Sequence, residues 1–224
     1  MRISLETRLL GANELIAHNN RTTFSNQGIL VINLMSSPGS GKTTILEKTI
    51  SRLADQIRMA VVEGDLYTDQ DAQRIEQQGV KVVQINTEGT CHLDAGMVSH
   101  ACQQLLTQKP ELLFIENVGN LVCPAEFDLG EDLRAVVISV PEGNDKITKY
   151  PLVFQRAEVV LVNKIDLLPF TDFDVDKVKR DIGLINPKAK IFLVSARNGD
   201  GLDEWISWLL EQIEVKKGTN LNLE

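Results

Sequence analysis

The fold is decided by the stretch Ser36-Ser37-Pro38-Gly39-Ser40-Gly41-Lys42-Thr43. An apolar run at residues 29–35 precedes it, and a segment with helical spacing follows it. Glycines let backbone N–H groups approach phosphate oxygens, a helix N-terminus favours anions, lysine neutralises the β- and γ-phosphates, and a threonine hydroxyl ligates Mg²⁺. The stretch therefore predicts a phosphate loop, although Ser36 replaces the first glycine of the pattern G-x4-G-K-[ST]. The residues expected to hold the phosphates are Gly39, Ser40, Gly41, Lys42, Thr43 and Thr44.

Short apolar runs rich in β-branched residues alternate with segments of helical spacing along the chain. Such runs are typical of strands buried on both faces of a sheet. We predict strands at residues 29–35, 58–62, 81–86, 112–116, 135–140, 159–163 and 190–195. Together with the phosphate loop, the alternation predicts an α/β fold of the P-loop NTPase type, with a mostly parallel sheet of about seven strands covered by helices.

The 224 residues suit one sizeable domain. Residues 1–28 are polar and predict an N-terminal helical or extended segment, with a turn at Asn19-Asn20-Arg21. Residues 29–215 form the predicted P-loop domain, and residues 216–224 form a predicted frayed tail.

Composition excludes several classes of protein. The formal net charge of −8 argues against a general nucleic-acid binder, which needs clustered Lys and Arg. No apolar stretch is long enough to predict a membrane span or a signal peptide. The odd number of cysteines, three, suits a reducing compartment where thiols stay free. A cytoplasmic protein with no nucleic-acid or membrane partner is therefore expected.

The predicted strand at 159–163 ends in the run Asn163-Lys164-Ile165-Asp166. A carboxylate at Asp166 accepts hydrogen bonds from N1–H and the exocyclic amine of guanine, and adenine offers no matching donors. Burying that carboxylate unpaired against adenine costs about 1–3 kcal/mol. Ser195-Ala196-Arg197 looks like the backbone segment that contacts the guanine carbonyl in GTPases. We therefore expect guanine to be bound by Asn163, Lys164, Asp166, Ser195 and Ala196.

Acidic residues follow two strands near the expected γ-phosphate position. Asp65 comes after the strand at 58–62, and Glu116 ends the strand at 112–116. Glu116 stands where most GTPases carry the aspartate of Asp-x-x-Gly. Lys42, Asp65 and Glu116 are the candidate catalytic residues, and Mg²⁺ is expected on Thr43, Asp65 and Glu116. Asp65 either binds Mg²⁺ or orients the attacking water, and the sequence leaves both roles open. Asp69 and Asp71 are expected to cap the following helix.

Two cysteines and a histidine follow strands that end at the same edge of the sheet. Cys91-His92 comes after the third predicted strand, and Cys123 lies seven residues beyond Glu116. Thiolates and imidazole suit Zn²⁺, Ni²⁺ or copper, so these residues predict a metal site. A fourth ligand would be water, a carboxylate such as Asp94, or a residue of a second subunit. Cys102 shares the apolar face of a predicted helix and is assigned to the core.

Five segments together resemble the hydrogenase nickel-incorporation GTPase family, HypB. They are Ser36–Thr43, Glu63-Gly64-Asp65, Cys91-His92-Leu93-Asp94-Ala95, Glu116–Pro124 and Asn163–Asp166. The resemblance extends from about Asn19 to Ile213, and its specific parts are the Cys-His-Leu-Asp-Ala run and the segment from Glu116 to Pro124.

The resemblance implies a SIMIBI-like, Mg²⁺-dependent GTPase that hydrolyses GTP to GDP and phosphate and assists nickel insertion into [NiFe]-hydrogenase. It also implies a homodimer favoured by GTP, with a Ni²⁺ or Zn²⁺ site at the interface made of Cys91, His92 and Cys123. The implied partners are other maturation factors and the hydrogenase large subunit.

Two alternatives stay open. A nickel-delivery GTPase for another enzyme, such as urease, has similar nucleotide motifs, but its metal motif is Cys-Pro-His and this chain has Cys91-His92 without the proline. A zinc-stabilised dimeric scaffold with vestigial GTPase activity would use the same thiols for structure alone.

Overall fold

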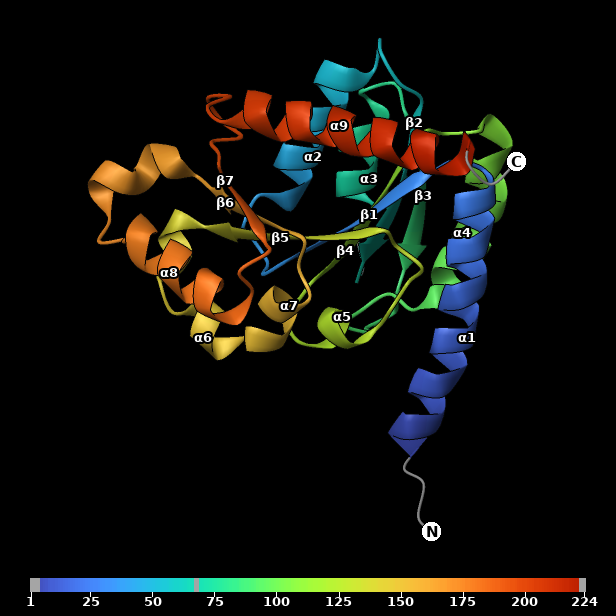
Figure 1. The fold of residues 1–224 in the computed structure, drawn as a ribbon, viewed down its shortest axis with the longest axis horizontal. Helices are drawn as coiled ribbons and strands as arrows, with labels where there is room; N and C mark the ends of the chain where they lie inside the picture. Colours follow the sequence, from blue (N-terminus) through green and yellow to red (C-terminus); the bar gives the residue numbers. More distant parts are fainter. Residues whose placement is uncertain (1–4, 67–68, 222–224) are drawn as a thin grey trace.

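A computed structural model describes residues 5–66 and 69–221 as one α/β domain (Figure 1). The strands are β1 (Leu30–Ser36), β2 (Met59–Asp65), β3 (Lys81–Asn86), β4 (Leu112–Gly119), β5 (Leu133–Ser139), β6 (Val159–Asn163) and β7 (Lys190–Leu193). They form a parallel sheet in the order β3-β2-β4-β1-β5-β6-β7. The fold class and the seven predicted strands are confirmed, with ends that differ by a few residues.

Helices cover both faces of the sheet (Figure 1). The helices are α1 (Leu5–Asn26), α2 (Lys42–Leu53), α3 (Gln70–Glu76), α4 (Ala95–Leu105), α5 (Cys123–Glu126), α6 (Lys146–Lys149), α7 (Pro151–Gln155), α8 (Val175–Ile185) and α9 (Leu202–Leu221). Short 3₁₀ turns lie at Leu106–Gln108, Val140–Glu142 and Ile165–Phe170. Helices α2, α3 and α9 pack on one face, whereas α1, α4 and the helices α5 to α8 pack on the other.

The predicted phosphate loop follows the central strand β1, which lies between β4 and β5. Side chains are buried along the whole of β1 and along β4 as far as Val118. Strand β4 continues to Gly119, three residues beyond the predicted end at Glu116. The carboxyl ends of parallel strands meet at one edge of a sheet, and this edge therefore gathers the polar residues that follow β1, β2, β4 and β6.

The N-terminal segment differs from the predicted turn. Helix α1 runs without interruption through Asn19-Asn20-Arg21. The turn prediction relied on the weak helix propensity of asparagine. Here the Asn20 side chain instead donates hydrogen bonds to the backbone of two distant segments, which compensates for that weakness.

The C-terminal helix also differs from the frayed tail that was predicted. Helix α9 continues to Leu221, and the Nζ of Lys216 lies 2.6 Å from Asp132 Oδ1 and 3.0 Å from Ser25 Oγ. Lys217 pairs with Glu111 at 3.0 Å. These contacts extend the helix over 216–221, and residues 222–224 lie outside the described residues. Within the described parts of the chain, no helix is both long and apolar enough to span a bilayer.

Candidate functional site

The phosphate loop connects the buried strand β1 to the start of α2. Gly39 and Gly41 have φ values of +77° and +90°, which side chains disfavour. A Cβ on Gly41 would also collide with the side-chain amide of Asn163. Ser36 is the last residue of β1 and is outside the positive-φ residues. This position therefore needs no glycine, which explains how the loop tolerates the departure from G-x4-G-K-[ST].

A cavity of about 500 Å³ lies over this loop, at the carboxyl edge of the sheet. Its size is in the range of small-molecule and cofactor sites. The predicted phosphate-binding residues Gly39, Ser40, Gly41, Lys42, Thr43 and Thr44 all line it, with Asp65, Asp71, Arg74, Gly119 and Lys164 opposite or beside them.

The predicted guanine-binding residues are joined to the phosphate loop by hydrogen bonds. Asn163 Nδ2 donates to Ser40 O at 2.8 Å, and Lys164 Nζ donates to Gly39 O at 2.6 Å. Lys164 takes a left-handed conformation with φ +63°, which turns the chain at the end of β6. The loop and the end of β6 therefore form one connected site.

The last segment of the predicted base site joins the same network. Ser195 Oγ donates to Asp166 Oδ1 at 2.6 Å, and the Ala196 N–H donates to Asn163 Oδ1 at 3.1 Å. Asp166 is half-buried and Ser195 is fully buried. All five predicted guanine-binding residues are thus brought together.

Lys42, Thr43 and Glu116 meet beneath the phosphate loop. Thr43 Oγ1 donates to Glu116 Oε1 at 2.6 Å, and Lys42 Nζ lies 3.3 Å from the same oxygen. Glu116 is 2 % exposed, and its second oxygen, Oε2, has no hydrogen-bond partner among the described residues. A buried carboxylate oxygen without a partner is costly, so this donor set fits an Mg²⁺ ion bound by Thr43 and Glu116.

Glu63 is a buried acid at this site that the sequence analysis did not single out. It sits on β2 directly opposite Glu116 on β4, and it is 2 % exposed. Burial, followed by repulsion from Glu116, raises the pKa of Glu63 to about 8. Its Oε2 also lacks a hydrogen-bond partner among the described residues. The sequence gives no sign of this pairing, because a single acid within an apolar strand does not indicate which residue lies beside it on the neighbouring strand.

We expect Glu63 to make the protein less stable as the pH rises. The folded state keeps the Glu63 proton up to a pKa of about 8, whereas the unfolded chain loses it near 4.5. Between these values the folded state binds more protons, so the free energy of unfolding falls with increasing pH. Glu63→Gln mimics the protonated acid and should be more stable than wild type at pH 8 but not at pH 4.5.

Urea unfolding in EDTA without nucleotide, at several pH values, measures this difference. Glu76→Gln on the exposed face of α3 is the matched control and should leave the pH dependence unchanged. An equal pH dependence in Glu63→Gln and wild type would contradict the prediction.

Asp69 and Asp71 do not act as the predicted side-chain caps. Asp69 occupies the N-cap position of α3 without a capping hydrogen bond from its side chain, and instead accepts one from Gln73. Asp71 pairs with Arg74 at 2.7 Å. Carboxylate oxygens of Glu63, Asp65 and Asp71 lie within 4.8 Å of one another, so Asp71 belongs to the acidic side of the cavity.

The three predicted metal ligands are also brought together. Cys91 Sγ lies 2.9 Å from Cys123 Sγ and 3.8 Å from His92 Nδ1. The hydrogen bond with Cys91, followed by burial, raises the pKa of Cys123 above its ordinary value. Burial lowers the pKa of His92, which favours the neutral imidazole that a metal needs. The cluster has the ligand types of a Zn²⁺ or Ni²⁺ site.

Two other residues discussed in the sequence analysis have structural roles. Asp94, considered as a fourth ligand, caps α4 by accepting a hydrogen bond from the Met97 N–H at 2.8 Å. Cys102, on the buried face of α4, is 2 % exposed and lies in the core, as predicted, and burial raises its pKa to about 12.

Comparison with known proteins agrees with this geometry. Residues 30–193 match the family model described as CobW/HypB/UreG, nucleotide-binding domain. The hydrogenase maturation factor HypB of Azotobacter chroococcum is 50% identical over 219 residues, which are 98% of this chain and 70% of that protein. The chain belongs to the HypB family. The hydrogenase/urease maturation factor HypB of Helicobacter hepaticus is 43% identical, over 97% of this chain and 89% of that protein.

Solved structures place the chain among HypB proteins in the same way. HypB from Helicobacter pylori, crystallised in complex with nickel, superposes with a TM-score of 0.87 and 40% identity, covering 92% of this chain and 97% of that one. The signal recognition particle receptor FtsY of Elizabethkingia anophelis shares only the fold, with 15% identity, a TM-score of 0.55, and coverage of 81% of this chain and 65% of that one. The resemblance to the HypB family is confirmed.

Proposed function

We propose that this HypB-family protein is an Mg²⁺-dependent GTPase that hydrolyses GTP to GDP and phosphate and assists nickel insertion into [NiFe]-hydrogenase. The observation that carries the proposal is the pairing of two sites along one segment of chain. Strand β4 contributes Glu116, which contacts Lys42 and Thr43, and the chain then reaches Cys123 beside Cys91. A nucleotide site connected in this way to a thiol cluster supports a metal-handling GTPase.

GTP is favoured by the base site and by the charges around the phosphates. Asp166 offers a carboxylate to the guanine edge, and Lys42 supplies a positive charge beneath the β- and γ-phosphates. An Mg²⁺ ion held by Thr43 and Glu116, with Asp65 as a further ligand or water-orienting residue, would neutralise charge that develops on the phosphate oxygens. Asp65 and Asp71 line the same cavity, where they can orient the attacking water.

Nickel would be carried by Cys91, His92 and Cys123 as cargo. Three ligands leave a tetrahedral or square-planar site incomplete, and Cys91 is exposed. Val122, next to Cys123, is 52 % exposed although it is apolar. These features support a homodimer favoured by GTP, in which a second subunit completes the site. The expected partners are the hydrogenase large subunit and other maturation factors.

The segment between the two sites supplies a means of coupling them. Gly119 lines the nucleotide cavity, and the next residue, Asn120, donates a hydrogen bond to Cys91 O at 3.2 Å. Asn117, adjacent to Glu116, accepts a hydrogen bond from the N–H of Leu93 at 3.2 Å. A shift of this segment with the γ-phosphate would therefore move both ligand loops, and metal binding would act back on the nucleotide site.

We expect Cys91→Ala and Cys123→Ala to weaken Ni²⁺ binding by more than about 100-fold relative to wild type. Losing a residue that only orients a metal ligand weakens binding by about 10- to 100-fold, and these variants lose a ligand itself. Competition titration with a chelator of known affinity, in GDP and in a GTP analogue, measures the loss and the coupling. Cys102→Ala removes a thiol from the core and should leave the affinity unchanged, apart from any change in stability.

Two outcomes would contradict the proposal. Ni²⁺ affinity that survives in both cysteine variants would place the metal elsewhere. Equal Ni²⁺ affinity of wild type in the GDP and GTP-analogue states would remove the coupling. Oligomeric state, recorded by light scattering in the same samples, tests the GTP-favoured dimer.

Maturation of urease is a second candidate function, because the Helicobacter hepaticus relative is named a hydrogenase/urease maturation factor. Genes for hydrogenase or urease subunits near the coding region would separate the two targets. A zinc-stabilised scaffold with vestigial hydrolysis is distinguished by GTP turnover in the Lys42 variant considered in the Discussion.

A further inference from the structure

Helix α1 meets the rest of the protein through two asparagines. Among residues 10–26, its buried positions are Asn13, Ala17, Asn20 and Phe24, which share one face of the helix. Half of this stripe is polar, so the face is unlike an ordinary apolar packing surface. Buried amides of this kind need hydrogen-bond partners, and their partners show what the helix holds.

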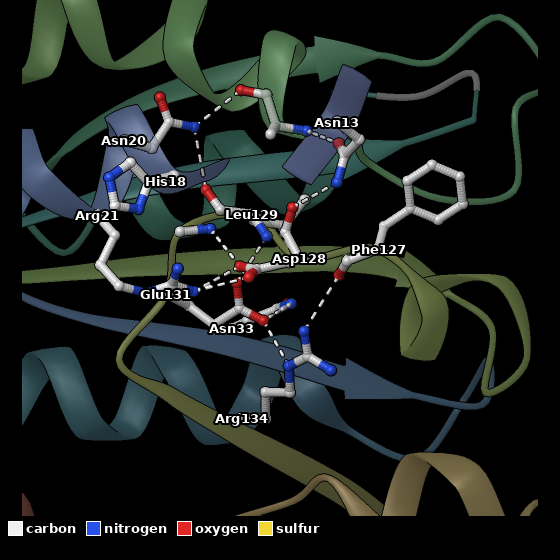
Figure 2. Close-up of polar contacts among 12 residues, drawn as sticks. Asn13, His18, Asn20, Arg21, Asn33, Phe127, Asp128, Leu129, Glu131 and Arg134 are labelled. Carbon is white, nitrogen blue, oxygen red and sulfur yellow. Dashed lines mark hydrogen bonds and ion pairs between the residues drawn. The ribbon is translucent and has the colours of Figure 1, made fainter. Parts of the chain in front are cut away.

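Asn13 bridges the two chain segments that follow the metal ligands. Its Oδ1 accepts a hydrogen bond from the Ala95 N–H at 2.8 Å, and its Nδ2 donates to Asp128 O at 2.8 Å (Figure 2). Ala95 lies three residues after His92, and Asp128 lies five residues after Cys123. One side chain of α1 therefore joins the His92 segment to the Cys123 segment.

Asn20 makes the same bridge two turns further along α1. Its Nδ2 donates to Ala95 O at 2.9 Å and to Leu129 O at 3.0 Å (Figure 2). The N–H and the C=O of Ala95 are thus both bound by α1, one by each asparagine. We call Asn13 and Asn20 the asparagine clamp.

The loop at 127–131 is pressed against α1 at a third point. Gly130 has φ +91°, and a Cβ there would lie 2.7 Å from Ala17 O and 2.6 Å from the Cβ of Asn20. Arg21 adds an ion pair to both carboxylate oxygens of Asp128 at 2.7 and 2.8 Å (Figure 2). The loop backbone is therefore in direct contact with α1, with no room for a side chain at position 130.

This loop reaches the metal cluster through Phe127. The Phe127 ring stacks on the His92 imidazole with centroids 3.9 Å apart and an interplanar angle of 26°. Within the loop, Glu131 Oε2 accepts a hydrogen bond from the Leu129 N–H at 2.7 Å. The position of His92 thus depends on the loop as well as on Ala95.

We propose that Asn13 and Asn20 are positioning residues of the metal site, because they hold the Cys91-His92 and Cys123 segments at the spacing that lets the three ligands converge. The proposal rests on the metal site of the proposed function. Residues that orient metal ligands from outside change affinity about 10- to 100-fold when they are lost.

The test uses the full chain with GDP bound, so that the nucleotide site serves as an internal check of folding. Asn13→Asp keeps the acceptor for the Ala95 N–H but loses the donor to Asp128 O. Asn20→Ala loses both of its donated bonds. Gly130→Ala leaves both asparagines in the sequence but places a Cβ against Ala17 O and the Cβ of Asn20, which pushes the loop away from α1. Asn19→Ala, at an exposed position of the same helix, is the matched control.

Two readouts follow the metal site itself. Ni²⁺ affinity is titrated with the Ni²⁺-thiolate absorption recorded, and the rate at which diamide joins Cys91 and Cys123 in a disulfide is measured without metal. In the second reaction two thiols lose two protons and two electrons, which reduce diamide to its hydrazine. The buried Cys102 lies in the core and away from this pair.

We expect the clamp variants to bind Ni²⁺ about 10-fold or more weakly, with an altered absorption spectrum and slower disulfide formation, while GDP affinity matches the Asn19→Ala control. Folded variants with unchanged Ni²⁺ affinity and unchanged disulfide rate would overturn the proposal. If wild type bound no Ni²⁺, the proposed function would fail, and the disulfide rates would still decide whether the clamp positions the thiols. A variant that unfolds is left out of this decision, which then rests on the folded variants among those at Asn13, Asn20 and Gly130.

Discussion

Lys42→Ala is expected to lower the rate of GTP hydrolysis by about 100-fold or more, the loss typical of removing one preorganised charge or donor from a transition state. The Lys42 side chain is 11 % exposed and lines the cavity over the phosphate loop, and its Nζ lies 3.3 Å from Glu116 Oε1. In the proposed reaction, its ammonium group would stabilise the negative charge that develops on the β–γ bridging oxygen as the γ-phosphoryl group is transferred.

Phosphate release at saturating GTP and Mg²⁺ measures the loss. Lys48→Ala, an exposed lysine of the same helix, is the matched control and should hydrolyse GTP like wild type. Removing Lys42 also leaves buried Glu116 without its cation, so thermal unfolding must show that the variant is folded. Slow turnover that is identical in wild type and Lys42→Ala would favour the scaffold with vestigial hydrolysis.

Asp166→Asn is expected to weaken GTP binding about 10- to 100-fold and to shift the preference toward xanthosine triphosphate. A bound guanine would present N–H donors to Asp166, whereas xanthine has a carbonyl in place of the exocyclic amine and would need a donor from the protein. An asparagine at this position can supply that donor and still accept the hydrogen bond from Ser195 Oγ.

Competition of GTP, ATP and xanthosine triphosphate against a fluorescent GDP measures the preference. Asp172→Asn, six residues further along at an exposed position, is the control and should prefer GTP. An unchanged preference in Asp166→Asn would show that Asp166 does not bind the base.

That the predicted nucleotide-binding residues lie together could be inferred from the sequence because each set is local in sequence. The phosphate loop, the Asn-Lys-x-Asp run and the Ser-Ala pair each follow a strand, and the rule that parallel strands end at one edge was enough to bring them together. The same rule brought Cys91 and His92 to Cys123. Spacing and residue type therefore predicted which side chains meet, and the structure adds their distances.

Residues whose partners are far away in sequence could not be predicted. Asn20 was assigned to a turn, but its side chain bonds to Ala95 and Leu129, which are 75 and 109 residues distant. Glu63 was named only within the segment Glu63-Gly64-Asp65 and not as a candidate site residue, because its neighbour Glu116 lies on another strand. Local propensity cannot show either contact, since both depend on how the sheet and α1 pack.

The contacts between the phosphate loop and the end of β6 have a consequence for how a nucleotide is captured. The side chains of Asn163 and Lys164 donate hydrogen bonds to the carbonyls of Ser40 and Gly39, so groups of the protein itself tie the loop to β6. Because these bonds are formed within the protein, we expect the loop to be ordered as the protein folds. Nucleotide binding then costs less conformational entropy, because the site is preorganised. A substitution that disturbs the end of β6 is therefore expected to weaken phosphate binding as well as base selection.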